Sequence, residues 1–148
     1  MNDAILKDYY VSHDKALLDY DFVVRELQMS YWGGNRSKAQ ILKSIDHSLC
    51  FGMYETPKPE QPTWRDAQVG FARVVTDFAT FAWICDIFIT QYLRKKGLGT
   101  MLMAYVMNDP YVKPRACLLT TGNMHKFYGE FGFTSCMAMK RLPEGGGE

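Results

Sequence analysis

Residues 89–100 read ITQYLRKKGLGT, and this stretch decides the fold. It continues an apolar run over 81–89, passes through a basic turn with two glycines, and enters a segment with helical periodicity. The apolar side chains of that segment recur at i, i+3, i+4, i+7 and i+8: Leu98, Met101, Leu102, Tyr105 and Val106. The stretch therefore predicts a strand buried on both faces, a tight turn and an amphipathic helix in direct succession.

The flanking sequence predicts the remaining elements. We expect strands over 5–12, 49–55, 67–75, 81–89, 116–120 and 133–142. The third and fourth of these form a hairpin around Asp77. Helices are expected after an Asp19 or Asp21 cap, after the capping box at Ser37, at 98–106, and around Phe127, Tyr128 and Phe131 with Gly132 at the end. This order predicts an α/β fold with a mixed sheet.

Length and composition limit the classes of protein to which this chain can belong. The 148 residues fit one domain, 1–148, with a disordered tail over 143–148. A net charge of +1 argues against nucleic acid as a partner. The four cysteines form no C-x-x-C pair, so no metal site is expected. The first residues do not resemble a signal peptide and no window is apolar enough for a membrane span, so we expect no membrane association and a cytoplasmic location.

The turn at 94–99 is suited to a phosphorylated ligand. The first N–H groups of a helix have no internal partner, and the helix dipole makes that end partly positive. Gly97 and Gly99 let a pyrophosphate approach those donors, and Arg94, Lys95 and Lys96 add positive charge. The glycine order fits neither a P-loop nor a dinucleotide fingerprint. On its own, however, such a turn is better explained by tight backbone geometry.

Two motifs together resemble the GCN5-related N-acetyltransferase (GNAT) superfamily. RKKGLG at 94–99 matches the family's Q/R-x-x-G-x-G/A motif, and TGNMHKFYGEFGF at 121–133 is similar to its second signature, a Tyr followed by Gly-Phe. The resemblance covers about 49–140. It implies a mostly antiparallel sheet with one splayed parallel pair and helices on both faces. It also implies an N-acetyltransferase that moves the acetyl group of acetyl-coenzyme A to an amine.

The resemblance also implies a cofactor-binding set. Strand amides of Ile87, Phe88 and Ile89 would bond the pantetheine arm, and one would stabilise the oxyanion on the thioester carbonyl. The pyrophosphate would lie on Arg94, Lys95, Lys96, Gly97, Leu98, Gly99 and Thr100. Asn123 either contacts the pantetheine chain or caps the following helix.

Tyr128 is the candidate general acid. A free phenol has a pKa of about 10 and a free thiol one of about 8.5, so the phenol stays protonated at neutral pH and can protonate the departing thiolate. The alternative is a core aromatic beside Phe127 and Phe131. The family signature favours catalysis.

Asp86 is the candidate base or amine anchor, because it interrupts an apolar strand and burial would raise its pKa. The alternative is a structural ion pair with Arg73 on the preceding strand, in which case water accepts the proton of the amine. Tyr31, Trp32 and Arg73 are weaker candidates for acceptor contacts, and loop position alone adds Arg36 and Asp77.

Two other functions stay open on the sequence alone: a coenzyme A binding or sensing module without catalysis, and an interaction domain without a cofactor. The acceptor is not indicated; a small amine, an amino acid, an antibiotic and a protein N-terminus all fit. An exposed strand edge near the C-terminus makes a homodimer a further expectation.

Overall fold

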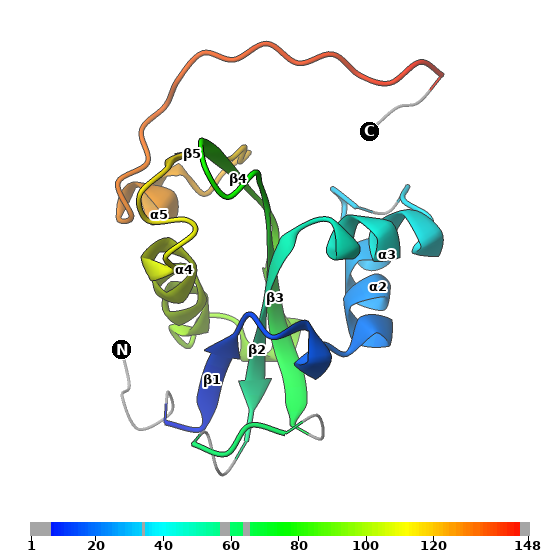
Figure 1. Cartoon of the computed structure of the whole chain (residues 1–148), viewed down its shortest axis with the longest axis vertical. Coiled ribbons are helices and arrows are strands. Elements are labelled where there is room, and N and C mark those ends of the chain that lie inside the picture. Colours follow the sequence, from blue (N-terminus) through cyan, green and yellow to red (C-terminus); the bar gives the residue numbers. More distant parts are fainter. Residues whose placement is uncertain (1–6, 34, 57–59, 64–65, 146–148) are drawn as a thin grey trace.

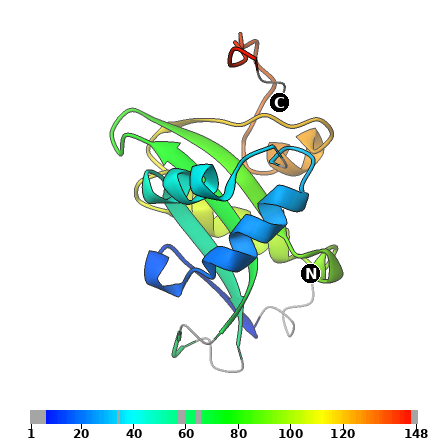
Figure 2. The ribbon, with the colours of Figure 1, turned by 90° about the vertical axis from the view of Figure 1, so that its right-hand side faces the viewer.

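The computed structural model describes residues 7–33, 35–56, 60–63 and 66–145, arranged as three layers. A sheet forms the middle layer, with α4 and α5 on one face and α2 and α3 on the other (Figure 1). Figure 2 views the sheet from the side that α2 and α3 cover. The expected helices on both faces are thus confirmed. Within the described part of the chain, no helix is long and apolar enough to cross a membrane.

The strands are β1 Tyr9–Ser12, β2 Leu49–Glu55, β3 Ala67–Thr76, β4 Phe81–Ile89 and β5 Ala116–Leu118. The α-helices are α2 Tyr20–Met29, α3 Lys38–Asp46, α4 Leu98–Asn108 and α5 His125–Gly129. Two 3-10 turns, η1 Lys15–Leu17 and η2 Gln91–Leu93, complete the set.

The sheet has the order β1-β2-β3-β4-β5. The first four strands pair antiparallel with their sequence neighbours, whereas β4 and β5 run parallel. The parallel pairing covers Phe81–Trp83 of β4, yet β4 continues to Ile89. The two parallel strands therefore part after Trp83, as the resemblance implied.

The two helical layers each cover an apolar cluster. Asp19 caps α2 by accepting the Phe22 N–H, and Ser37 caps α3 by accepting the Gln40 N–H, as the sequence predicted. The apolar side chains of these helices pack against β2, β3 and β4. The strand residues of this buried cluster are Cys50, Phe71 and Phe88. On the opposite face α4 buries Leu98, Leu102, Met103 and Val106 in a larger cluster. Helices therefore cover both faces of the sheet along most of its length.

The hairpin between β3 and β4 is confirmed, and Asp77 fixes its turn. The Asp77 carboxylate accepts the N–H groups of Ala79 and Thr80 and the Thr80 hydroxyl. These bonds lower the pKa of Asp77, because they stabilise its ionised form.

Four predicted elements are shorter or less buried than expected, the first being β1, which begins at Tyr9 because residues 7 and 8 form a turn. The first half of β4 is not buried on both faces, since Phe81 and Trp83 are each 39% exposed. The α2–α3 cluster reaches β4 only at Phe88, which leaves the start of the strand uncovered. Strand β5 ends at Leu118, and α5 ends before Phe131. Gly132 has the predicted left-handed backbone, with a φ of 89°.

The predicted last strand over 133–142 is wrong. These residues belong to no strand, and residues 134–142 are exposed. A strand exists only where its backbone pairs with a free edge. After Gly132 the chain runs away from the sheet and over the top of the molecule, so it meets no such edge (Figures 1 and 2). Residues 5, 6 and 146–148 of the predicted first strand and tail lie outside the described residues.

Candidate functional site

The loop between β4 and α4 has a defined shape. Leu93 is buried in the core, and the Arg94 Nε donates to the Ile89 carbonyl at 3.1 Å. Lys95 and Gly97 both have positive φ, 65° and 86°. Gly97 is the N-cap of α4, a position where its left-handed backbone favours glycine. The loop therefore forms a tight turn that leads directly into the first residue of α4.

The start of α4 can bind an anion. No side chain caps it, so the amides of its first turn are not used by a capping group. Arg94, Lys95 and Lys96 are exposed beside it. A Cβ built on Gly99 meets only the Phe127 Cζ, at 3.9 Å, so the space above this turn is open. The residues predicted to hold a pyrophosphate therefore fit that group chemically and sterically.

The residues predicted to bind pantetheine lie on the part of β4 that β5 does not pair with. Ile87, Phe88 and Ile89 follow the last β4–β5 pair, Trp83 with Leu118. Phe88 packs into the α2–α3 cluster and Ile89 into the α4 cluster, so their side chains are used for packing. A ligand between the strands would meet the backbone of this segment.

A β-bulge shapes β4 at Asp86. Phe71 pairs with Phe88 and Arg73 pairs with Cys85, so two β4 residues, Asp86 and Ile87, face one β3 residue. The bulge reverses the alternation of the strand. Asp86 has a φ of 51°, which a residue other than glycine rarely adopts.

Asp86 forms a buried cluster with two arginines. Arg36, from the loop between α2 and α3, donates to both carboxylate oxygens at 2.8 and 2.9 Å. Arg73 on β3 donates its Nε to Asp86 at 2.8 Å and its Nη1 to the Ser48 hydroxyl at 3.1 Å. Only 4% of the Asp86 side chain is exposed. The structural pairing with Arg73 is confirmed, and Arg36 is an additional partner.

The expected rise in the pKa of Asp86 is wrong. Burial does raise it, but the hydrogen bonds and charges of Arg36 and Arg73 together outweigh burial and hold the pKa below its usual value. A carboxylate held ionised in this way is a weaker base than a free one. The geometry favours a role in positioning over proton transfer.

Tyr128 lies on α5, half-buried among aromatic rings. Its ring is 5.1 Å from that of Phe127 and 6.2 Å from that of Phe133. Burial, and to a lesser degree the Tyr31 phenol, raise the pKa of Tyr128. The phenol is therefore protonated at neutral pH, as a general acid requires.

The two aromatic residues predicted on the acceptor side lie on the opposite helical layer. Tyr31 and Trp32 follow α2 directly, with rings 5.1 Å apart and exposed fractions of 88% and 42%. The electrostatic effect of Tyr31 on Tyr128 links this loop to α5. The two segments, almost a hundred residues apart in sequence, thus lie toward the same end of the sheet on its opposite faces (Figure 1).

Asn123 does not cap α5. The N-cap is Met124, and no side chain caps this helix. The capping alternative for Asn123 is therefore wrong, while its contact with pantetheine stays a prediction.

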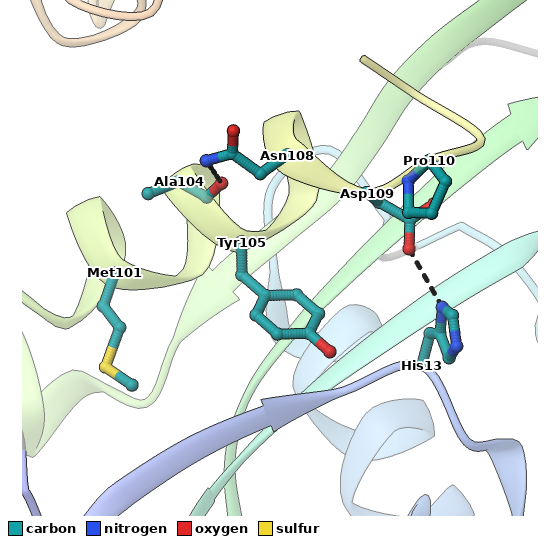
Figure 3. Close-up of a pocket in the computed structure, with 7 residues that line it drawn as sticks. All are labelled: His13, Met101, Ala104, Tyr105, Asn108, Asp109 and Pro110. Carbon is teal, nitrogen blue, oxygen red and sulfur yellow. Dashed lines mark hydrogen bonds and ion pairs between the residues drawn. The ribbon is translucent and has the colours of Figure 1, made fainter.

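A pocket on α4 lies apart from these residues (Figure 3). It is lined by His13, Met101, Ala104, Tyr105, Asn108, Asp109 and Pro110. His13 Nδ1 is 2.9 Å from the buried Asp109 carboxylate, which also accepts the Tyr111 N–H. The pair ties the end of β1 to the end of α4, and none of the predicted site residues lines this pocket.

Comparison with known proteins decides the family. A model of the GNAT acetyltransferase domain matches residues 49–135, from the start of β2 to just beyond α5. The chain belongs to the GNAT acetyltransferase family. The match includes Arg73, Asp86 and Tyr128 and leaves out Tyr31, Trp32 and Arg36.

Relatives of this GNAT protein agree with the assignment. It is 32% identical to a Gibberella zeae protein named as an acetyltransferase, over 84% of this chain and 78% of that one. A crystal structure of a GNAT-family protein from Xanthomonas campestris is 34% identical, with a TM-score of 0.79, and covers 93% of this chain and 94% of that one. N-acetylglutamate synthase from Neisseria gonorrhoeae, solved with coenzyme A and N-acetyl-glutamate, shares the fold at 14% identity and a TM-score of 0.61. That match covers 87% of this chain and 29% of the synthase.

Within this GNAT domain, sequence reasoning predicted the turn before α4 and the helix that carries Tyr128, but it undervalued Arg36. Arg36 lies 50 residues from Asp86 in a loop, and nothing in its local sequence marks it as a partner. The available signal was indirect: an acidic residue in an apolar strand needs compensating charge, and one arginine on β3 satisfies only one of its two oxygens.

Proposed function

We propose that this GNAT protein is an N-acetyltransferase that transfers the acetyl group of acetyl-coenzyme A directly to an amine. The observation that supports the proposal best is the position of a protonated, half-buried phenol, Tyr128, at the end of the sheet where β4 and β5 part. The family as a whole uses acetyl-coenzyme A, and the start of α4 fits its pyrophosphate.

The chain supplies the parts that direct transfer needs. First-turn amides of α4, with Arg94, Lys95 and Lys96, bind the diphosphate. Backbone groups of β4 between Ile87 and Ile89 hold the pantetheine arm and stabilise the oxyanion. The amine nitrogen attacks the thioester carbonyl, the C–S bond breaks, and the Tyr128 phenol gives its proton to the departing sulfur.

The amine must lose a proton before or during the attack, and water is the acceptor we propose for it. Asp86 is unsuited to that step, because Arg36 and Arg73 already occupy its oxygens and lower its pKa. We assign Asp86 instead to positioning: it holds Arg36 and its loop, including Tyr31 and Trp32, against β4. The acceptor then lies between this loop and Tyr128.

The test measures the turnover of acetyl-coenzyme A with a panel of acceptors, and the release of free thiol is the readout. The panel holds small amines, amino acids, an aminoglycoside and a peptide with a free N-terminus. Tyr128→Phe removes only the proton donor. We expect it to lower kcat by about 10²-fold or more, as removal of a general acid does, while the Kd for coenzyme A changes little.

Tyr105→Phe is the matched control, because it makes the same chemical change in a tyrosine on α4 that lines the separate pocket. It is expected to keep normal turnover. Normal turnover in Tyr128→Phe as well would remove Tyr128 from the mechanism. Tight coenzyme A binding without thiol release on any acceptor would favour the binding or sensing module.

A further inference from the structure

The face of the sheet that α2 and α3 cover is open over the first half of β4. Phe71 and Phe88 pack into the buried cluster under these helices. Val75 and Trp83 pair with each other on the same face but remain 44% and 39% exposed. We call this pair, which forms an open apolar surface on the β3–β4 hairpin, the Val75–Trp83 surface.

The charge cluster of Asp86 lies next to the Val75–Trp83 surface. Arg73 is two residues before Val75 on β3. Alternate residues of a strand share a face, so the Cα atoms of this pair lie roughly 7 Å apart on one side of the sheet. Asp86 lies on that side too, since it accepts hydrogen bonds from Arg73 and Arg36. A charged site and an apolar site are therefore neighbours on one surface.

The charges in this cluster do not balance. One carboxylate, that of Asp86, faces two guanidinium groups, and the other hydrogen-bond partner of Arg73 is the neutral Ser48 hydroxyl. Among the residues that the structure describes, neither Arg36 nor Arg73 forms an ion pair with a second acidic side chain. The cluster thus has one positive charge in excess. Because charge that is partly removed from water is costly without a counter-ion, the cluster favours an incoming anion.

The excess charge lies on the outer side of the cluster. Only 4% of the Asp86 side chain is exposed, whereas the exposed fractions of the Arg73 and Arg36 side chains are 14% and 20%. Arg73 donates through its Nε and Nη1, and its Nη2 donates to no residue in the described part of the chain. A guanidinium group with an N–H edge available is suited to bind a carboxylate.

The loop that contains Arg36 also presents two exposed aromatic side chains. Tyr31 and Trp32 are 88% and 42% exposed, with their rings 5.1 Å apart. A Cβ built on Gly33 would lie 2.7 Å from the Arg36 Nη2, so the backbone directly after Trp32 lies against the guanidinium group. Aromatic surface therefore adjoins this arginine from the loop, as the apolar surface on the hairpin adjoins the cluster from the sheet.

We infer that the acetyl acceptor is a free amino acid with an aromatic side chain. Its carboxylate binds Arg36 and Arg73, and its ring packs between the Val75–Trp83 surface and the aromatic loop. A peptide N-terminus has no carboxylate beside its amine and fits this site less well. The inference rests on the proposed function, because it names the acceptor of that reaction.

The chemical step is the proposed transfer, with the α-amino group as the nucleophile. A bond from its nitrogen to the acetyl carbon replaces the C–S bond. One proton of the amine passes to water, and the Tyr128 phenol gives its proton to the sulfur. The products are the N-acetyl amino acid and coenzyme A with a free thiol.

The first test compares three amines with the wild-type protein in the thiol-release assay. Phenylalanine has both features, phenylalanine amide keeps the ring and the amine but lacks the negative charge, and alanine keeps the carboxylate but lacks the ring. We expect kcat/KM for phenylalanine to exceed each of the others by about tenfold or more, since a hydrogen bond to a charged group and the burial of a ring each supply such a factor. Equal use of the amide or of alanine overturns the inference.

The same assay distinguishes failure of this inference from failure of the proposed function. Thiol release with other amines of the panel, but not with phenylalanine, would refute the aromatic amino acid and leave acetyl transfer standing. No thiol release with any acceptor would refute acetyl transfer itself. Calorimetry with phenylalanine and its amide, in the presence of coenzyme A, would then still test the site, and equal or absent heats would refute it as well.

The second test removes the excess charge. Arg36→Gln leaves Asp86 and Arg73 as a balanced pair, and we expect the ratio of kcat/KM for phenylalanine over its amide to fall by about tenfold or more. Because both substrates are measured on one preparation, this ratio does not depend on how much of the variant is folded. Trp83→Ala should instead lower the ratio for phenylalanine over alanine.

Arg25→Gln is the matched control. Arg25 is an exposed arginine on α2, and its guanidinium group lies over the ring of Phe22 in the same helix. This variant should keep both ratios. An Arg36→Gln protein that keeps the wild-type preference for phenylalanine over the amide would show that Arg36 does not bind the carboxylate, and it would overturn the inference.

Discussion

Gly52 on β2 leaves no room for a side chain, because the Tyr54 ring lies over it. A Cβ at this position would lie 2.1 Å from the Tyr54 Oη and 2.4 Å from its Cζ, far inside contact distance. Tyr54 is fully buried and stacks on Tyr10 with ring centroids 5.0 Å apart. Glycine is therefore needed here because of packing rather than backbone conformation.

We therefore expect Gly52→Ala to destabilise the protein by about 2 kcal/mol, the usual cost of overpacking a core. Chemical denaturation measures this directly. Gly129→Ala is the control, because a Cβ there meets nothing within 4 Å and alanine favours the helix. An unchanged denaturation midpoint for Gly52→Ala would mean that Tyr54 does not lie over Gly52.

For single residues, the sequence predicted some side-chain interaction partners and missed others. The Arg73–Asp86 pair was predictable, because a hairpin places neighbouring strands in a countable register. The direction of the Asp86 pKa shift was not, since it depends on Arg36, which a loop brings from 50 residues away. Nor did any residue pattern indicate the bulge that gives Asp86 a φ of 51°.

Helix α4 and the loop before it form the element on which the proposed coenzyme A binding depends. Gly97 is needed for its left-handed backbone, with a φ of 86°. Gly99 lies inside the first turn with open space above it. The two glycines thus serve different purposes, which substitution can separate.

Gly97→Val is expected to lose about 1–2 kcal/mol of stability, because a side chain disfavours the left-handed region, and to weaken coenzyme A binding. Gly99→Ala should keep or slightly raise stability, since alanine is the better helix former. It should still weaken coenzyme A binding at least tenfold, as its methyl group fills the approach to the amides. Calorimetry and thermal melts give both quantities. Unaltered affinity in both variants would place the diphosphate elsewhere.

Elements with strong periodicity were predicted closely. Strands β2 and β4 have the predicted bounds, and α4 begins at the predicted Leu98, because alternation and helical spacing are local properties. The arm at 133–142 has the same strand-like pattern but forms no strand. A pattern shows that a segment is suited to pairing, whereas pairing itself needs an available edge.

At the scale of the whole molecule, a buried charge cluster connects the sheet to one of its two helical layers. Asp86 connects β4 to β3 through Arg73 and to the α2–α3 layer through Arg36. Its pKa is lower in the folded protein than in the unfolded chain. The stability it adds is therefore present above its unfolded pKa of about 4 and is lost as the pH falls through its folded pKa.

We expect Asp86→Asn to lower the free energy of unfolding at pH 7 by about 3 kcal/mol, because it leaves two arginines without their counter-charge. Below about pH 4 the wild-type protein loses the same contribution, so the difference between the two should narrow. Urea denaturation at a series of pH values tests this. Exposed Glu60→Gln is the control and should follow the wild type. Parallel curves for Asp86→Asn and the wild type would refute the linkage.

The placement of the chain's two ends relative to Tyr128 has a practical consequence. Strand β1 begins at the end of the sheet opposite to α5 and β5 (Figure 1). Phe133, by contrast, packs 6.2 Å from Tyr128, ring to ring, and leads straight into the arm. A bulky label attached within residues 134–142 would disturb the segment that borders this tyrosine, whereas one attached near Tyr9, where β1 begins, would lie far from it. Labels for assays of this protein are therefore best placed near β1.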